Sequence, residues 1–336
     1  MKKFLASIIA VVLAVSGLSV ISITANAATI FISGNYEYTV NSDDTVNIVG
    51  YKGIATDITI PSQILNKNVV KISDNSFYNN STLTSVKIPN TIKVVGSMAF
   101  HNCTKLSKVT LPSNLTEIGY NAFEGTTALT TITIPKTVTT AGNNVFNGSA
   151  LKTAAIENGA TAVADNLFSN AKNLTKVTIP NTVKKIGSMS FYDCTKLSSV
   201  TLPNTLTSIE TSAFENCQAM KSITIPKSVT YFGTTAVGYS DGRVIDGFII
   251  YGYKNTKAQT YATKNKITFK ALQEETVPVG DINNDGKIDV SDVTYLQMYL
   301  SGNSSYVIKN TKAADANGDG KIDVADVTKI QTIIAS

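Results

Sequence analysis

Large apolar residues recur at a fixed interval through the middle of the chain. The phenylalanine steps are 23, 23, 23, 22, 23 and 23 residues, at Phe77, Phe100, Phe123, Phe146, Phe168, Phe191 and Phe214. Proline follows the same period after a first step of 28, at Pro61, Pro89, Pro112, Pro135, Pro180, Pro203 and Pro226. Such a period predicts stacked repeats that share one continuous core.

One unit, residues 106–123, shows what each position does. Val109 and Leu111 alternate with polar neighbours, which is typical of a half-buried strand. Pro112 has no N–H to donate and is expected to end that strand. The later apolar residues, up to Phe123, return to the core from the opposite side. Stacking such units predicts a mostly β solenoid of about eight coils spaced by about 4.8 Å.

The second residue after each phenylalanine is always Asn, Gly or Asp. The set is Asn79, Asn102, Gly125, Gly148, Asn170, Asp193 and Asn216. These residue types tolerate positive φ, so we expect a left-handed turn there. A solenoid must also cover its open ends. Tyr36–Val40 and Val46–Tyr51 are predicted to form an N-terminal hairpin, and residues 248–272 a C-terminal cap.

These units resemble bacterial leucine-rich repeats of the BspA type, over about residues 36–271. The resemblance implies a right-handed solenoid that usually acts in surface binding or adhesion, without catalysis. The departures from the pattern are Glu157 for a proline, Ala154 for a strand aliphatic and Val237 for the last phenylalanine.

Two columns of side chains are expected on the solenoid surface. The outward strand positions hold Thr59, Lys87, Thr110, Thr133, Ala155, Thr178, Thr201 and Thr224. Threonine suits any exposed pleated surface, so this column is either a solvated face or a flat binding face for a glycan or protein. The positions just after each phenylalanine hold Tyr78, His101, Glu124, Asn147, Ser169, Tyr192 and Glu215. Such variety would be seen on a recognition face, and also on a solvated face whose residues have drifted without selection.

The three cysteines share one position in the repeat. Cys103, Cys194 and Cys217 each lie three residues after a phenylalanine, where other units carry Asn, Thr, Ser or Ala. This pattern favours small buried packing residues. A disulfide between Cys194 and Cys217 is the alternative, although its geometry would be strained. One cysteine per coil along a line does not suggest a metal site.

The C-terminal residues contain two copies of a calcium-loop pattern, 281–292 and 315–326. Oxygen ligands stand at loop positions 1, 3, 5, 9 and 12, with glycine at position 6 and a backbone carbonyl at position 7, as in an EF-hand. The predicted metal ligands are Asp281, Asn283, Asp285, Lys287, Asp289, Asp292, Asp315, Asn317, Asp319, Lys321, Asp323 and Asp326. We therefore predict two bound Ca²⁺ ions.

Each loop is predicted to be followed, but not preceded, by a helix. Val293, Leu296 and Leu300 lie on one face of the first helix, and the spacing recurs in the second copy. A module of 56 residues is too small to rely on its core alone. We expect calcium binding to be coupled to its folding.

This duplication is similar to the type I dockerin, the calcium-dependent plug that attaches secreted proteins to cohesin modules of a cellulosome-like scaffold. The resemblance covers residues 280–336. It implies a small all-α, EF-hand-like module whose cohesin contacts are Val290, Ser291, Gln297, Met298, Val324, Ala325, Gln331 and Thr332. The pairs at loop positions 10 and 11, Val290-Ser291 and Val324-Ala325, are more apolar than the Ser-Thr pair familiar in the family, so the cohesin partner is left undetermined.

The N-terminal residues predict export. Lys2 and Lys3 precede an apolar stretch that ends at Ala25-Asn26-Ala27, which is the pattern of a cleaved signal peptide over residues 1–27. An uncleaved anchor is the alternative. No later segment is long and apolar enough to span a bilayer. We expect a secreted, extracellular chain with a repeat domain at 28–272, a linker at 273–279 and the dockerin at 280–336.

Charge and composition narrow the function. The net charge is +5, too small a surplus for a dedicated nucleic-acid binder. It divides into +6 for residues 28–278, +2 for the leader and −3 for the dockerin, with its 8 acids and 5 lysines. A single histidine excludes sites that need several, and tryptophan, a common sugar platform, is absent.

Three functions remain. The favoured one is a non-catalytic binding or adhesion protein, docked onto a polysaccharide-degrading complex. The second is a glycoside hydrolase, which needs two carboxylates about 5–9.5 Å apart. Glu117 and Glu210 are four coils apart, so His101 with Glu124 is the least improbable pair. The third is a protein-protein adaptor or inhibitor. In each case the repeat domain would contact a polysaccharide or protein ligand.

Overall fold

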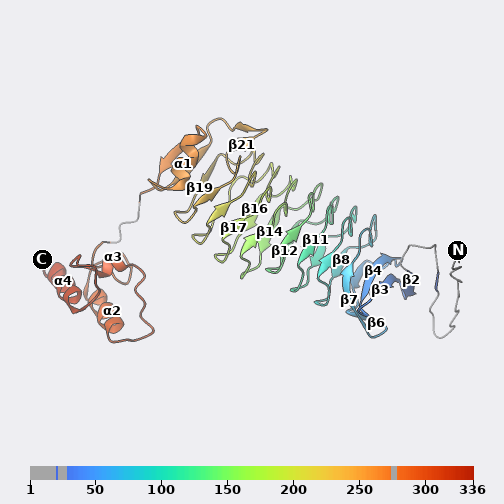
Figure 1. Cartoon of the computed structure of the whole chain (residues 1–336), viewed down its shortest axis with the longest axis horizontal. Coiled ribbons are helices and arrows are strands. Elements are labelled where there is room, and N and C mark those ends of the chain that lie inside the picture. Colours follow the sequence, from blue (N-terminus) through green and yellow to red (C-terminus); the bar gives the residue numbers. More distant parts are fainter. Residues whose placement is uncertain (1–19, 22–28, 274–277) are drawn as a thin grey trace, which may run out of the picture. The chain divides into compact units, whose positions relative to one another are not determined.

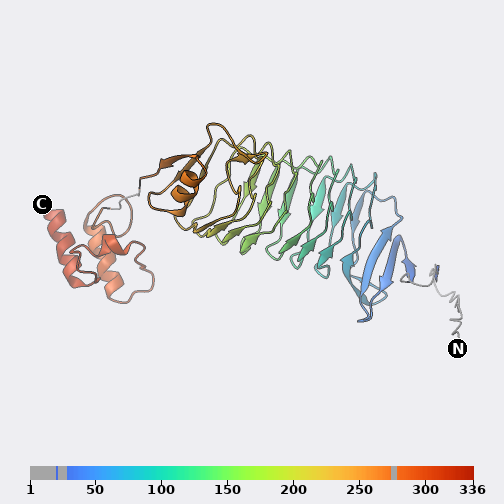
Figure 2. The same ribbon diagram turned by 45° about the horizontal axis from the view of Figure 1, so that its top comes forward.

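The computed structural model describes residues 20–21, 29–273 and 278–336. The predicted leader, residues 1–27, therefore lies outside the described residues except for a two-residue strand, β1 (Val20–Ile21), which pairs with β2. Contacts divide the chain into two units, Met1–Leu272 and Gln273–Ser336. The first unit is a β-solenoid followed by a small cap, and the second is a group of short helices (Figures 1 and 2).

The N-terminal end of the solenoid is the predicted hairpin. The strands there are β2 (Ile30–Ser33), β3 (Tyr36–Val40), β4 (Val46–Tyr51), β6 (Gln63–Ile64) and β7 (Lys67–Ile72). β3 pairs antiparallel with β4, and β4 then pairs parallel with β7. The first repeat is longer than the others, since Pro61 and Pro89 are 28 residues apart. Its additional residues form the β6–β7 hairpin, which turns through Leu65 and Asn66 at positive φ.

The coils contribute short parallel strands to two faces. One face, here called the strand face, contains β5 (Asp57–Thr59), β8 (Ser85–Lys87), β10 (Lys108–Thr110), β12 (Thr131–Ile134), β14 (Thr153–Ile156), β16 (Lys176–Thr178) and β19 (Ser222–Thr224). The other contains β9 (Val94–Val95), β11 (Glu117–Ile118), β13 (Thr140–Ala141), β15 (Ala162–Val163), β17 (Lys185–Ile186), β18 (Ser208–Ile209) and β20 (Tyr231–Phe232). The registers keep the sequence period, as in Val109 opposite Val86.

The repeat phenylalanines form one continuous stack in the core. All seven are at most 2% exposed. Successive ring centroids from Tyr51 to Phe214 lie 5.3, 4.9, 5.3, 5.7, 5.8, 5.5 and 5.0 Å apart. Offset stacking of this kind adds to the free energy gained by burying each ring. The sequence period thus specifies both the coil length and the core.

The predicted left-handed turn is confirmed in every unit, with φ between 55° and 68° from Asn79 to Asn216. A second left-handed position, two residues before the phenylalanine, was not predicted. It includes Met98, Met189 and Thr235, types that give no sequence signal for positive φ. The backbone there is set by the ladder between coils, since the Met98 N–H donates to the Tyr120 carbonyl at 2.7 Å.

The C-terminal end of the solenoid is closed by β21 (Tyr239–Ser240), β22 (Arg243–Val244), β23 (Ile249–Gly252), helix α1 (Lys257–Lys264) and β24 (Thr268–Ala271). β23 continues the strand face by pairing parallel with β19, and β24 pairs with β23. Figure 1 shows α1 at this end of the solenoid. Ala258, Tyr261 and Ala262 are its buried residues.

The second unit contains α2 (Val290–Leu300), α3 (Thr311–Ala314) and α4 (Val324–Ala335). α2 and α4 are the predicted helices after the two loops. The expectation that no helix precedes a loop is wrong for the second copy, because α3 ends directly before Asp315. The Asn310 side chain caps α3 by accepting from the N–H groups of Lys312 and Ala313, and α3 buries Ala313 and Ala314.

Candidate functional site

The first predicted calcium loop is folded around its own carboxylates. The Asp281 carboxylate accepts hydrogen bonds from the N–H groups of Asp285 and Gly286 at 3.1 and 3.0 Å. The Asn283 Oδ1 accepts from the Asp285 N–H at 2.9 Å, and the Asp285 Oδ1 accepts from the Lys287 N–H at 2.9 Å. Gly286 holds the sharp turn at φ 87°. These bonds join the loop's own side chains to its backbone.

The end of the first loop is also the beginning of α2. Asp289 accepts from the Ser291 N–H at 2.8 Å, while Asp292 Oδ2 accepts from the Asp289 N–H at 3.0 Å, which makes a capping box. Hydrogen bonds from Ser291 lower the pKa of Asp289. Asp292 Oδ1 also accepts from the N–H groups of Ile282 and Asn283, at 2.7 and 3.0 Å. One carboxylate therefore joins the beginning of the loop to the helix.

The second loop repeats most of this arrangement. Asp315 accepts from the N–H groups of Asp319 and Gly320 at 3.0 and 2.9 Å. Asp326 accepts from the Asn317 and Asp323 N–H groups at 3.1 and 2.9 Å. The copies differ at loop position 11, because the Ser291 hydroxyl of the first copy accepts from the Asn283 amide at 2.8 Å and its counterpart is alanine.

Burial of negative charge is what most distinguishes these loops. Asp281, Asp292 and Asp326 are 2%, 0% and 0% exposed, and they are the only charged residues among the buried ones of the described chain. No ion pair of the described residues includes any of them. A buried carboxylate without a cation is costly. The oxygen donor set and the missing counter-charge both fit a hard cation such as Ca²⁺.

Carboxylates alone do not complete the set. No three His, Cys, Asp or Glu side chains within the described ranges are grouped so that they could hold a metal ion. The predicted calcium set also includes the amide oxygens of Asn283 and Asn317 and the backbone carbonyls of Lys287 and Lys321. The structure places all twelve predicted ligands in the two loops or at the first turns of the following helices.

Most of the residues predicted to contact cohesin lie on the surface. Val290 and Val324, at loop position 10 of each copy, are 71% and 70% exposed. Ser291, Gln297, Ala325, Gln331 and Thr332 are also exposed, whereas Met298 is partly buried. Two exposed valines at equivalent positions give each copy an apolar contact point.

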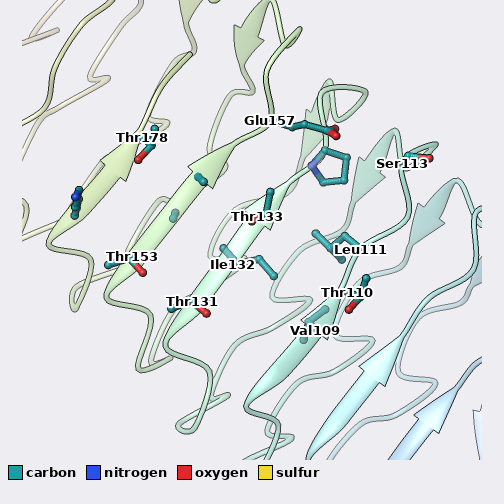
Figure 3. A pocket seen from close by; sticks show the side chains of 14 residues that line it. Val109, Thr110, Leu111, Ser113, Thr131, Ile132, Thr133, Thr153, Glu157 and Thr178 are labelled. Carbon is teal, nitrogen blue, oxygen red and sulfur yellow. The ribbon is translucent and has the colours of Figure 1, made fainter.

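The strand face of the repeat domain carries a shallow groove of about 660 Å³ (Figure 3). Its walls include the predicted threonine column, with Thr110, Thr133 and Thr178 on β10, β12 and β16. The groove lies where the sheet is interrupted, since β10 pairs with β8 while β12 belongs to a separate sheet with β14 and β16. Val109 and Leu111 are consequently only partly buried.

The irregular repeat contributes to the same groove. Ala154 and Ala155 replace larger side chains on β14, and Glu157 replaces the proline. The Glu157 carboxylate accepts from the Lys136 N–H at 3.0 Å, and Figure 3 shows Glu157 at the edge of the groove. The departures from the repeat pattern therefore coincide with a change of shape on the strand face.

The second surface column brings His101 and Glu124 together. His101 Nδ1 is buried and lies 3.2 Å from Glu124 Oε2, but it makes no well-directed hydrogen bond. The His101 ring stacks on Tyr78 at 4.9 Å, and Glu124 Oε1 accepts from the Asn147 amide at 2.8 Å. The pair lines no part of the strand-face groove. Its contacts are those of a surface ladder that supports neighbouring coils.

The prediction for the cysteines is confirmed. Cys103, Cys194 and Cys217 are buried and free. Each thiol donates to the carbonyl of a phenylalanine on the preceding coil, at 3.1 to 3.2 Å. Burial raises the pKa of Cys103 to about 12 and that of Cys194 and Cys217 further above the ordinary value. They are therefore packing residues that also join adjacent coils.

Solved structures of bacterial leucine-rich repeat proteins are similar to this chain. A protein from Bacteroides ovatus is 24% identical, with a TM-score of 0.51 over 76% of this chain and 69% of its own, and shows the fold. The leucine-rich repeat protein of T. pallidum is 26% identical, with a TM-score of 0.47 over 70% of this chain and 95% of its own. A cell surface protein from Faecalibacterium prausnitzii is 29% identical, with a TM-score of 0.45, and the match covers 64% and 76% of the two chains.

Family models match both units. The model described as BspA type leucine rich repeat region matches in six copies, over residues 47–174 and 161–241. The model for the dockerin type I domain matches residues 279–334. No curated protein sequence matches the chain. None of the helices in the described ranges is long and apolar enough to cross a membrane. The chain belongs to the BspA-type leucine-rich repeat family and carries a type I dockerin domain at its C-terminal side.

Proposed function

We propose that this protein is a secreted, non-catalytic binding or adhesion component that attaches through its dockerin, in a calcium-dependent way, to a cohesin on an extracellular polysaccharide-degrading complex. Repeat domains and dockerins are typically non-catalytic. The observation that carries the proposal is the burial of Asp281, Asp292 and Asp326 in two loops with oxygen donors and no cationic partner. The predicted leader over residues 1–27 supports export.

Calcium supplies positive charge, which the acidic loops lack. With net −3 over residues 279–336, two Ca²⁺ ions would bring the module to about +1. Two of the predicted ligands also hold the loops together. Asp292 and Asp326 accept from backbone groups on both sides of each loop, so a bound cation would stabilise a fold that these carboxylates already connect.

The proposed cohesin surface is the exposed part of the two loop-helix copies. Val290 and Val324 would occupy apolar positions on the cohesin, since each exposes about seven-tenths of its surface to water. Burial of an exposed valine contributes about 1.5 kcal/mol to binding. Ser291 and Ala325 differ in hydrogen-bonding capacity, so the two copies would not contact a cohesin equivalently.

The decisive test is cohesin capture with matched variants. The full chain is immobilised, and type I cohesins are measured in calcium and in excess EGTA. We expect binding in calcium alone, and at least a tenfold loss for Val290→Asp with Val324→Asp, because two charges would be buried at an apolar contact. Ile54→Asp, at an 85% exposed residue of the repeat domain, is the control. Affinity that persists in EGTA would rule out the dockerin mechanism.

The hydrolase alternative has a direct test of its own. His101 and Glu124 are the one acid-base pair that the fold assembles from the predicted candidates, at 3.2 Å. A glycosidase needs two carboxylates flanking a sugar. We expect the purified chain to release no reducing sugar from plant polysaccharides or starch. If the chain does release sugar and Glu124→Gln abolishes that release, the protein is an enzyme.

A further inference from the structure

The C-terminal cap of the repeat domain has a one-sided charge. Residues 247–273 contain five lysines and neither aspartate nor glutamate. The lysines are Lys254, Lys257, Lys264, Lys266 and Lys270, and all five are exposed. None of them belongs to an ion pair among the described residues. This part of the cap therefore presents a cluster of cations without a carboxylate of its own, which attracts anions, whereas the preceding β21–β22 segment contains Asp241, Arg243 and Asp246.

A groove of about 520 Å³ lies where the cap meets the last coil. One wall is β20 with the residues that follow it, and the other is α1. Lys257 and Lys264 both line the groove. They are seven residues apart, so they lie on one side of α1, about two helical turns from each other. The cluster of cations is thus aligned along a concave site.

The groove walls are held by the cap's own packing. The Tyr261 ring stacks on Phe232 with centroids 4.6 Å apart, and its hydroxyl donates to the Val237 carbonyl at 3.2 Å. The Tyr239 hydroxyl donates to the Asn265 side chain at 2.8 Å. These contacts fix α1 against β20, so the two lysines are carried on a rigid support.

The remaining lining residues are neutral and suited to a polyhydroxylated ligand. Tyr231 is 51% exposed, which leaves ring surface free for stacking. Thr230, Thr234 and Thr260 are exposed lining residues. The Thr230 and Thr260 hydroxyls donate to the carbonyls of Thr207 and Thr256, at 3.3 and 3.2 Å, so both are left to accept from a ligand. The nearby Glu215 carboxylate already accepts from Thr235 and the Gly242 N–H, at 2.9 and 3.2 Å. It does not line the groove.

We propose that this groove binds a carboxylate-bearing polysaccharide, a chain of uronic acid residues. Lys257 and Lys264 would pair with carboxylates, the threonine hydroxyls with sugar hydroxyls, and Tyr231 would stack on a sugar ring. A phosphate polymer or a membrane surface would use the lysines but not the hydroxyl and aromatic lining. The inference names a ligand for the binding half of the proposed function and does not depend on calcium or cohesin.

The test measures binding of the full chain to polygalacturonate by calorimetry, in excess EGTA so that the dockerin loops cannot bridge calcium to the polymer. Fully methyl-esterified polygalacturonate, which has the same backbone without charge, is the matched probe. We expect Lys257→Gln with Lys264→Gln to weaken binding by about tenfold. The control pair, Lys254→Gln with Lys270→Gln, removes the same charge outside the groove and is expected to weaken it by less than about threefold.

The aromatic contribution has its own control. Tyr231→Ala is expected to weaken binding by about fivefold, whereas Tyr120→Ala, at a 60% exposed tyrosine outside the groove, should have no effect. Equal losses for both lysine pairs would show diffuse adsorption and overturn the proposal. So would equal affinity for the methyl ester, or tighter binding to DNA or anionic vesicles. Because polysaccharide binding is measured in EGTA, where no cohesin binding is expected, its outcome does not depend on the dockerin. Either proposal can therefore fail without the other.

Discussion

The repeat domain and the dockerin bury polar groups in opposite ways. The buried polar residues of the solenoid are neutral: Ser76, Thr126, Ser149, Ser169, Ser190, Ser212 and Asn216. Those of the dockerin are three aspartates, Asp281, Asp292 and Asp326. A hydroxyl needs only a nearby carbonyl, as when Thr126 donates to the Phe123 oxygen, three residues earlier, at 2.7 Å. A carboxylate also needs positive charge.

The apolar cores differ in the same sense. The solenoid core is one cluster that extends from the N-terminal hairpin to Ile267. The dockerin core has seven buried residues, two of which are alanines, Ala314 and Ala316. The repeat domain is therefore stabilised by its own side chains, whereas the dockerin is expected to depend on a bound cation.

Removing calcium should therefore unfold the dockerin and leave the repeat domain folded. This is the largest effect that we expect. In excess EGTA, α2 and α4 should lose amide protection because the repulsion among eight acids is no longer offset. The repeat domain should keep its protection. Hydrogen exchange by mass spectrometry on the full chain measures both in one sample. Protected α2 and α4 amides in EGTA would contradict the comparison.

Phe191→Ala tests the self-sufficiency of the solenoid. Phe191 is fully buried and lies 5.5 and 5.0 Å from the rings on either side. Its removal should cost about 3–5 kcal/mol, measured as the urea unfolding of the repeat domain. Tyr120→Ala, at an exposed site, should stay within about 0.5 kcal/mol. A cost under 1 kcal/mol for Phe191→Ala would show that the stack is not the core.

Asp292→Asn and Asp326→Asn compare the two calcium loops. Each substitution keeps the size of a fully buried side chain and removes its charge. Each should weaken calcium in its own loop by more than the roughly 10–100-fold typical of outer-shell partners. Calorimetry should count one tight calcium ion in place of two. Asp57→Asn, on an exposed strand of the repeat domain, should change neither count nor affinity.

The smallest effect that we expect is a pH dependence of stability from the cysteines, all of which lie in the repeat domain. Burial raises the pKa of Cys103 to about 12, so its stabilising protonated form persists in the folded chain. That contribution is complete below the unfolded pKa of about 8.5 and is lost as pH rises toward 12. Iodoacetamide at pH 8 should label the native chain slowly and the urea-unfolded chain fast. Cys103→Ser should reduce the loss of stability between pH 8 and pH 10. Fast native labelling would disprove the burial.

Much of the fold could be predicted because its determinants are periodic. Phenylalanine spacing predicted the coil length and the core position of each ring, and Asn, Gly and Asp predicted the first left-handed turn. The second left-handed position is Asn in four coils, at Asn75, Asn121, Asn144 and Asn166, but the signal is broken by Met98 and Met189. Those two methionines adopt positive φ because their N–H groups donate to carbonyls of the next coil. Helix α3 was missed because its few residues are stabilised by an Asn310 cap and by burial of two alanines.

The repeat, both caps and the two acidic loops depend on local spacing along the chain, so they can be predicted from the sequence. The three-dimensional structure was needed to show where the strand face is interrupted and that Lys257 and Lys264 border a groove with Tyr231. Those outcomes depend on how distant segments pack. A one-dimensional pattern does not encode the shape of a surface between two coils.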